Sequence, residues 1–287
     1  MIHQTWQSKL TDDAASRGPG LAYLPDLAVT RFDGADAATF LQGYFTCDTA
    51  DLAPGVLTPT ALCSLKGRVV LDGWCTPGAD GDRIVLVLHR SLAGRLAEFL
   101  ARYLNFSRTR LEDVTDRTLV LGSLDLPDAG GLGLDPRRRL FLLDDLDAAA
   151  ALWSDHPHLT AEAWLASLTE DGFPLVSEPV SERFLPQMLD LARLGAVDFD
   201  KGCYLGQEVV ARAQHRGEVK RRLARLSWEG DAPPPPGSEV RDENGRGLGV
   251  IVQSAAPDAG SGPALAVLAR EIPHVLRGEG VTLHLRA

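Results

Sequence analysis

The spacing of apolar residues predicts alternating strands and helices in the first part of the chain. LAVTRF (27–32) alternates as a strand does, and DRIVLVLH (82–89) is an almost continuous apolar strand. The apolar residues of DGADAATFLQGYFTCD (33–48) and SLAGRLAEFLARYLN (91–105) keep helical spacing instead. TALCSLKGRVVLDGWC (60–75) predicts a hairpin that turns at its Lys-Gly step, because glycine tolerates positive φ. These elements suggest helices packed on a mainly antiparallel sheet, which is an α+β lobe.

The pattern changes twice along the remaining chain. Strands are expected around Leu119–Leu124 and Leu140–Leu143, followed by helices over Asp147–Trp153 and Ala161–Leu168. After Arg222 the four prolines of APPPPGS, a hairpin turn at Asn244-Gly245 and several short strands predict a small all-β barrel or sandwich. The expected organisation is therefore a first α+β lobe (1–117), a second α+β lobe (118–217) and a C-terminal β-barrel (218–287).

Composition narrows the possible partners. The 287 residues carry a formal net charge of −10, which argues against a broad, sequence-independent grip on nucleic acid. Charge is uneven, however, because the stretch from Lys201 to Arg225 has seven basic residues against two acidic ones, a local charge of +5. No apolar run approaches the roughly 18 residues that span a bilayer, and the N-terminus lacks the apolar core of a secretory signal. We therefore expect no membrane association and a cytoplasmic location.

The four cysteines do not have the spacing of a metal site. Cys47, Cys63, Cys75 and Cys203 include no CxxC pair, so neither a zinc ribbon nor a redox dithiol is indicated. Each of them can be explained as a small buried apolar residue. We expect no metal ligands among them.

The segment KGCYLGQEVVARAQHR (201–216) has the highest density of special residue types. Gly202 and Gly206 are expected to bracket a bend, and the residues from Gln207 onward favour a helix. Cys203 then lies just before a helix N-terminus and two residues from Lys201, and both features stabilise a thiolate. The alternative is a tight turn in which Cys203 fills a small gap. The local chemistry leaves a functional thiol and a structural one equally open.

This segment also carries a resemblance. Residues 184–223, with the core Lys-Gly-Cys-Tyr-x-Gly-Gln-Glu from 201 to 208, resemble the signature of YgfZ-type folate-binding proteins, relatives of the glycine-cleavage aminomethyltransferase (T-protein). FLQGYFTCD (40–48), CSLKGRVV (63–70) and EDGFP (170–174) extend the match along the chain. The resemblance implies a ring of two α+β lobes and a β-barrel around a central channel that holds tetrahydrofolate. It also implies a role in making or maintaining iron–sulfur enzymes, including those that thiolate tRNA, through the cysteine segment.

The resemblance nominates a set of site residues. Cys203 and Lys201 are the candidates for the reactive chemistry, and Glu170 falls where the transferase has a glutamate that hydrogen-bonds the pteridine. Lys66 flanks a turn where a cation is expected to meet the glutamate tail of folate. Arg212 and Arg216 share a helix face that is expected to engage this tail or a partner. Each has a plain alternative as a surface or capping residue, and Trp153 and Trp164 are either stacking or core aromatics. The candidate folate contacts are Glu170, Gln42, Thr46, Lys66, Tyr204, Gln207, Arg212 and Arg216.

Three functional hypotheses follow. The first is a folate-binding accessory protein whose partners are iron–sulfur enzymes or their assembly factors. The second is a folate-dependent one-carbon transferase or demethylase. The corresponding asparagine-containing stretch of the transferase should fall near VLHRSLAGR (87–95), where this sequence has neither Asn nor Asp, and that argues against aminomethyl transfer. The third is a tRNA-binding module that uses the basic stretch from Lys201 to Arg225, although the net charge predicts little direct binding.

Overall fold

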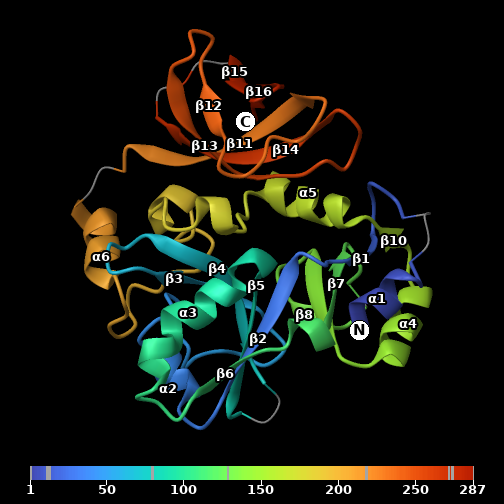
Figure 1. Ribbon diagram of the computed structural model, residues 1–287, viewed down its shortest axis with the longest axis vertical. Coiled ribbons are helices and arrows are strands. Elements are labelled where there is room, and N and C mark those ends of the chain that lie inside the picture. The colour runs from blue at the N-terminus through green and yellow to red at the C-terminus, as the bar shows by residue number, and fades with distance from the viewer. Residues whose placement is uncertain are drawn as a thin grey trace. The chain divides into compact units, whose positions relative to one another are not determined.

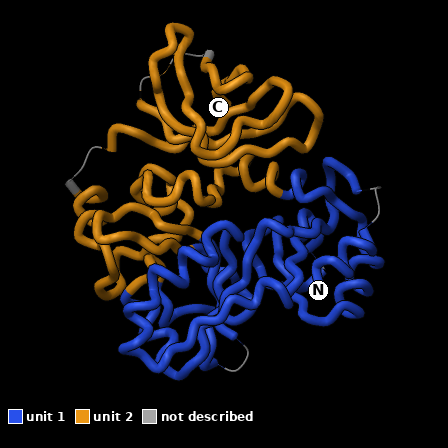
Figure 2. The backbone as a smooth tube through the Cα atoms, viewed as in Figure 1, with its two compact units in different colours: residues 1–43, 48–59, 73–164 blue, residues 44–47, 60–72, 165–287 orange. Residues whose placement is uncertain are grey.

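The chain divides into two compact units that are interleaved along the sequence. The computed structural model describes residues 2–10, 14–78, 81–127, 129–216, 219–270, 272 and 275–286. Unit 1 comprises Met1–Gly43, Asp48–Pro59 and Gly73–Trp164, and unit 2 comprises Tyr44–Cys47, Thr60–Asp72 and Leu165–Ala287 (Figure 2). Two short N-terminal segments therefore belong with the C-terminal part of the chain.

One five-stranded sheet of unit 1 has the order β10-β1-β7-β9-β8 (Figure 1). Its central strands pair antiparallel, whereas β10 pairs parallel with β1. Helices α1 (Ile2–Gln7) and α4 (Leu146–Ser154) contribute Trp6 and Trp153, whose rings meet edge to face at 5.7 Å in the core beside this sheet. Trp153 is thus a packing residue. The strands are β1 (Gly20–Tyr23), β7 (Leu119–Leu124), β8 (Leu132–Gly133), β9 (Arg138–Leu143) and β10 (His158–Leu159).

The other five-stranded sheet has the order β3-β4-β5-β2-β6. Helix α3 (Ala93–Leu104) contacts β2 and β6 and buries Ala93, Leu96 and Leu100, as its amphipathic pattern predicts. The expected hairpin is confirmed, since Gly67 has φ +66° and donates its N–H to Ser64 O. The strands are β2 (Leu27–Asp33), β3 (Thr58–Cys63), β4 (Val69–Pro77), β5 (Arg83–His89) and β6 (Arg110–Asp113).

The helix expected over residues 33–48 is shorter than predicted. Helix α2 covers only Ala37–Gln42 and is capped by Gly43. Beyond it, the N–H of Thr46 donates to Ala61 O at 2.9 Å, and Phe45 forms a β-bridge with Leu62. Backbone pairing with the end of β3 therefore replaces helical hydrogen bonds in this segment. Thr46, which was expected on the helix, lies outside it.

The C-terminal strands close into a barrel of order β11-β14-β13-β12-β15-β16 (orange to red in Figure 1). The barrel interior includes Leu226, Trp228 and Ile251, and the Asn244-Gly245 turn is confirmed by φ +82° at Gly245. The buried side chain of Gln253 in β13 donates to Thr169 Oγ1 and accepts from the Leu175 N–H, both at 2.7 Å. The strands are β11 (Arg221–Gly230), β12 (Glu239–Arg241), β13 (Gly247–Ser254), β14 (Ser261–Ala269), β15 (Val275–Gly278) and β16 (Val281–Leu285).

The remaining helices are α5 (Ala161–Asp171), α6 (Gln207–Arg216) and the short 3₁₀ turns Arg90–Leu92, Thr115–Arg117, Glu178–Val180 and Pro186–Leu189. The predicted class, mixed α and β with a C-terminal β-barrel, is confirmed. The lobe boundaries 1–117, 118–217 and 218–287 and the central folate channel stay predictions. Among the described residues, no helix combines the length and apolarity that a bilayer crossing requires.

Candidate functional site

The ammonium group of Lys201 is a buried anchor in unit 2. Its Nζ donates to Phe45 O at 2.7 Å and to Cys47 O at 2.5 Å, and the residue is 7% exposed. The backbone N–H of Lys201 in turn donates to the carboxylate of Asp198 at 3.0 Å. A buried cation needs such acceptors, because leaving it unpaired in the interior is costly. Lys201 therefore ties the segment that precedes Cys203 to the segment 45–47.

Thr46 extends the same anchor. Its Oγ1 donates to Ala196 O at 2.5 Å and accepts the Ala61 N–H at 2.9 Å, and its carbonyl accepts the Asp198 N–H at 2.8 Å. The side chain is fully buried. Thr46 and Lys201 thus fix one loop together, and in this structure Thr46 is a bridging residue between two backbone segments.

Two glycines let the β3–β4 turn pack against the first turn of α6. Gly206 has φ +82°, and a Cβ there would lie 2.4 Å from Ser64 O. Gly67 has φ +66°, and a Cβ there would lie 2.8 Å from the Cβ of Val209. Gly202, which was also expected to need special geometry, has an ordinary φ and open space around its Cα. The close approach therefore depends on Gly206 and Gly67.

Cys203 differs from the other cysteines in its exposure. Cys47, Cys63 and Cys75 are buried, as the apolar explanation predicts, and burial raises the pKa of the Cys63 thiol to about 12. Cys203 is exposed, on the anchored loop four residues before the start of α6. Of the four thiols, only that of Cys203 is both accessible and held on a fixed loop.

Tyr204 lies on the inner side of this loop. Its ring centroid is 5.5 Å from Lys201 Nζ, which places the cation over the aromatic face. Burial raises the pKa of its hydroxyl, and the nearby Cys63 and Asp198 raise it further. The hydroxyl is buried and has no hydrogen-bond partner among the described residues. The neutral phenol therefore faces inward while Cys203 faces solvent.

The other candidate residues are dispersed. Gln42, at the end of α2 in unit 1, accepts from the N–H and hydroxyl of Thr49, both at 2.8 Å, and donates to Asp48 at 3.0 Å. In unit 2, Lys66 is exposed at the β3–β4 turn, and Gln207 is the half-buried first residue of α6.

The two helix arginines and Glu170 also lie in unit 2. Arg212 forms an exposed pair with Glu208 at 3.0 Å, and the side chain of Arg216 is outside the described part. Glu170, near the end of α5, pairs with Arg286 at 3.1 Å. Five of the candidate residues thus lie in or beside the loop that precedes α6: Lys201, Cys203, Tyr204, Thr46 and Gln207.

Asp72 in β4 is a titratable residue that the sequence patterns did not single out. Its Oδ1 accepts the Val176 N–H at 2.7 Å, and its Oδ2 is buried with no partner among the described residues. Desolvation raises the pKa of this carboxyl to about 7, against the smaller opposing effect of the Val176 hydrogen bond. A lone aspartate within the buried run VVLDGWC was the available signal. Near-neutral carboxyls of this kind can hold or release a proton at physiological pH.

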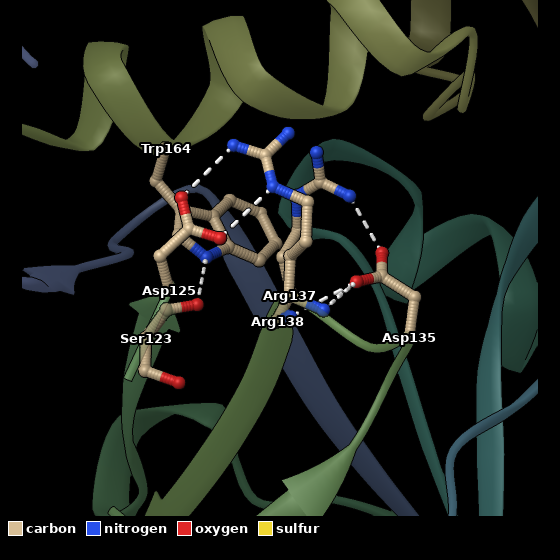
Figure 3. Close-up of polar contacts among 6 residues, drawn as sticks. All are labelled: Ser123, Asp125, Asp135, Arg137, Arg138 and Trp164. Carbon is tan, nitrogen blue, oxygen red and sulfur yellow. Dashed lines mark hydrogen bonds and ion pairs between the residues drawn. The ribbon is translucent and has the colours of Figure 1, made fainter. Parts of the chain in front are cut away.

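A polar cluster in unit 1 is held together by ion pairs and a hydrogen bond between its own residues (Figure 3). Arg138, 1% exposed, pairs with Asp135 at 2.6 Å, and Arg137 makes two 3.0 Å contacts with Asp125. Figure 3 shows the ring nitrogen of Trp164 directed at the carbonyl of Ser123, a distance of 3.2 Å. The Arg137–Asp125 pair joins the residues next to β7 and β9, and the ring nitrogen of Trp164 ties α5 to β7. Because Trp164 is 1% exposed, it is a core residue.

Comparison with known proteins places the chain in a family. No model of a known protein family matches it. The tRNA-modifying protein YgfZ of Cronobacter sakazakii is 31% identical over 275 residues, which cover 84% of this chain and 82% of that protein. Its counterpart in Sodalis glossinidius is 28% identical over 282 residues, covering 88% and 85%.

A solved structure has the same fold. The glycine cleavage system aminomethyltransferase T from Bartonella henselae matches with a TM-score of 0.70 at 17% identity, over 96% of this chain and 86% of that one. The T-protein-like fold expected from the sequence is thereby confirmed. That structure shows the fold, and the YgfZ proteins, one of them 31% identical over 82% of its length, show the family: this chain belongs to the YgfZ family.

Proposed function

We propose that the protein is a folate-binding accessory factor that supports tRNA-modifying enzymes, including iron–sulfur enzymes that thiolate tRNA, through the thiol of Cys203. The observation that carries the proposal is the exposure of Cys203 on a loop anchored by the buried ammonium of Lys201. The relatives are named as tRNA-modifying proteins, which supports the same process. In this proposal Cys203 reacts, and Lys201 positions the loop.

The chemistry of Glu170 fits a folate ligand. Its side chain is 49% exposed, and only Oε1 is engaged, by Arg286. A carboxylate oxygen accepts the amino and ring N–H donors of a pterin, and few other side chains accept two donors at once. Glu170 would hold the pterin of tetrahydrofolate. Thr46 is no longer proposed as a contact, because its side chain is fully buried and its hydroxyl is engaged by Ala196 and Ala61. The other candidate contacts remain proposed: Gln42, Lys66, Tyr204, Gln207, Arg212 and Arg216.

Replacing Cys203 with alanine should separate folate binding from function. We expect Cys203→Ala to bind tetrahydrofolate within about twofold of the parent by calorimetry, because the thiol is not a proposed folate contact. In a strain that lacks the endogenous protein, the variant should fail to restore tRNA thiolation, measured by mass spectrometry of nucleosides. Glu170→Gln should show the opposite defect, with weaker folate binding. Full restoration by Cys203→Ala would exclude the thiol from the function.

A second candidate, folate-dependent one-carbon chemistry, is favoured by Asp72. Its carboxyl has a pKa of about 7, a value suited to general acid–base catalysis, which contributes roughly 10²–10⁴-fold to rates. The side chain is only 2% exposed, so this role requires an opening that lets a substrate reach the carboxyl. If this activity exists, the protein incubated with tetrahydrofolate and an aminomethyl donor should form methylene-tetrahydrofolate and release ammonia, and Asp72→Asn should lower the rate at least a hundredfold. A rate equal to that without protein would exclude this candidate.

A further inference from the structure

Two adjoining cavities in unit 2 form one continuous groove. Their volumes are about 880 and 800 Å³. The first runs along Gln187, Phe199 and Gln214, and the second runs along Gly172, Leu285 and Arg286. Four residues line both cavities, which makes the two continuous: Asp190, Arg193, Arg222 and Arg270. We call this surface the arginine groove.

The charged residues of the arginine groove are mostly guanidinium groups. Among the described residues, the charged ones that line it are six arginines and two aspartates: Arg193, Arg221, Arg222, Arg225, Arg270, Arg286, Asp171 and Asp190. Asp190 is engaged by Arg193 at 2.7 Å. Arg221 and Arg222, both exposed at the start of β11, form no ion pair or hydrogen bond through their side chains with any described residue. The lining residues carry a local excess of +4, and Glu170, which pairs with Arg286, lowers it to +3. In a chain of net charge −10, this excess favours an anion site.

The groove also has an apolar part, which distinguishes between possible anions. Half-buried Phe199 and Val219 line the first cavity and half-buried Ile272 lines the second, whereas the lining residues Val197 and Leu268 are buried. An acidic peptide, whose side chains end in carboxylates, has no apolar group to contact these side chains. Single-stranded nucleic acid carries both phosphate groups and exposed bases. Guanidinium groups form paired hydrogen bonds with phosphate oxygens, and the bases stack on aromatic and apolar side chains.

We propose that the arginine groove binds the sugar–phosphate backbone of a single-stranded RNA segment, with its bases against the apolar side chains. The proposal does not rest on the thiol of Cys203, but the groove adjoins the proposed folate contact, because Arg286 at its edge pairs with Glu170. It departs from the expectation of little nucleic-acid binding, which rested on net charge. Net charge averages over the whole surface, whereas binding depends on the charge within about one Debye length, roughly 8–10 Å.

The test is fluorescence anisotropy with a fluorescein-labelled 12-nucleotide uridylate RNA and the full chain, across a series of salt concentrations. Four phosphate contacts would give a slope of log affinity against log salt of about −3, since each contact contributes about −0.7 on a single strand. Three arginines line both cavities, and one of them, Arg193, is paired with Asp190. Replacing the other two, Arg222→Ala combined with Arg270→Ala, should weaken binding at least tenfold and reduce the slope by about 1.4.

The matched control is Arg246→Ala combined with Arg277→Ala, two exposed arginines that do not line the groove. It removes the same charge and should bind RNA as the parent does. Thermal melting of both double variants shows whether they are folded. Equal affinity of the groove variant and the parent, equal losses in both double variants, or displacement of the RNA by hexaglutamate at the same concentration would each overturn the proposal.

Discussion

Replacing Asp72 with asparagine is expected to stabilise the protein at pH 8 by about 2–4 kcal/mol. Burial raises the pKa of this carboxyl from 3.8 to about 7, so at pH 8 the folded state contains a desolvated charge that water solvates in the unfolded chain. Asparagine has nearly the same shape, and its Oδ1 can still accept the Val176 N–H. The variant therefore keeps the hydrogen bond and removes the buried charge.

The pH dependence of this stability difference tests whether the buried charge of Asp72 causes it. Between about pH 4 and 7 the unfolded chain has released the Asp72 proton and the folded chain has kept it, so the contribution of Asp72 to stability falls as pH rises. Above pH 7 both states are ionised and the contribution is constant. Urea denaturation of parent and Asp72→Asn across pH 4–8 should show a difference that grows from near zero to its full value. Asp51→Asn, at an exposed site, should show no difference in stability from the parent across this pH range. A pH-independent stability difference for Asp72→Asn would contradict the argument.

Replacing Lys201 with methionine should lower the free energy of unfolding by about 2–4 kcal/mol. The substitution keeps most of the side-chain volume but removes the donors that satisfy Phe45 O and Cys47 O, and hydrogen bonds to charged groups are worth about 1.5–3 kcal/mol each. Lys201→Arg keeps the charge with a different donor geometry and should lose less. Chemical denaturation measures both.

A positional role for Lys201 requires a second measurement. If the ammonium holds the loop, the rate at which Cys203 is alkylated by iodoacetamide should change in Lys201→Met under conditions where the variant is fully folded. Lys9→Met, which removes an exposed lysine, serves as the control for both measurements. A stable Lys201→Met variant with an unchanged alkylation rate would show that the anchor is dispensable.

Local patterns predicted most elements because those elements bury one face at a fixed period. The hairpin at Gly67, helix α3 and the barrel strands follow from such patterns. The end of α2 did not, because it depends on the pairing of Phe45 with Leu62, which no local period encodes. Backbone partners distant in sequence therefore decided the boundary.

Side-chain roles were predictable only where sequence neighbours determine them. The sequence left Cys203 open between a functional thiol and a gap-filling residue, and its exposure was decided only by the structure. The acceptors of Lys201 lie 154 and 156 residues away. The arginine groove likewise collects residues from positions 193, 221–225, 270 and 286. The sequence showed the basic stretch from 201 to 225 but not the residues that complete it.

The interleaving of the two units limits how this protein can be divided. Residues 44–47 and 60–72 precede the main body of unit 2 by about a hundred positions, yet they supply the acceptors of Lys201 and the aspartate that binds the Val176 N–H. A fragment that starts at residue 165 would leave that ammonium and that amide without these partners. Proteolytic dissection or domain exchange at this boundary would thus yield pieces that must be recombined, as in split-protein complementation, before either regains its native interior.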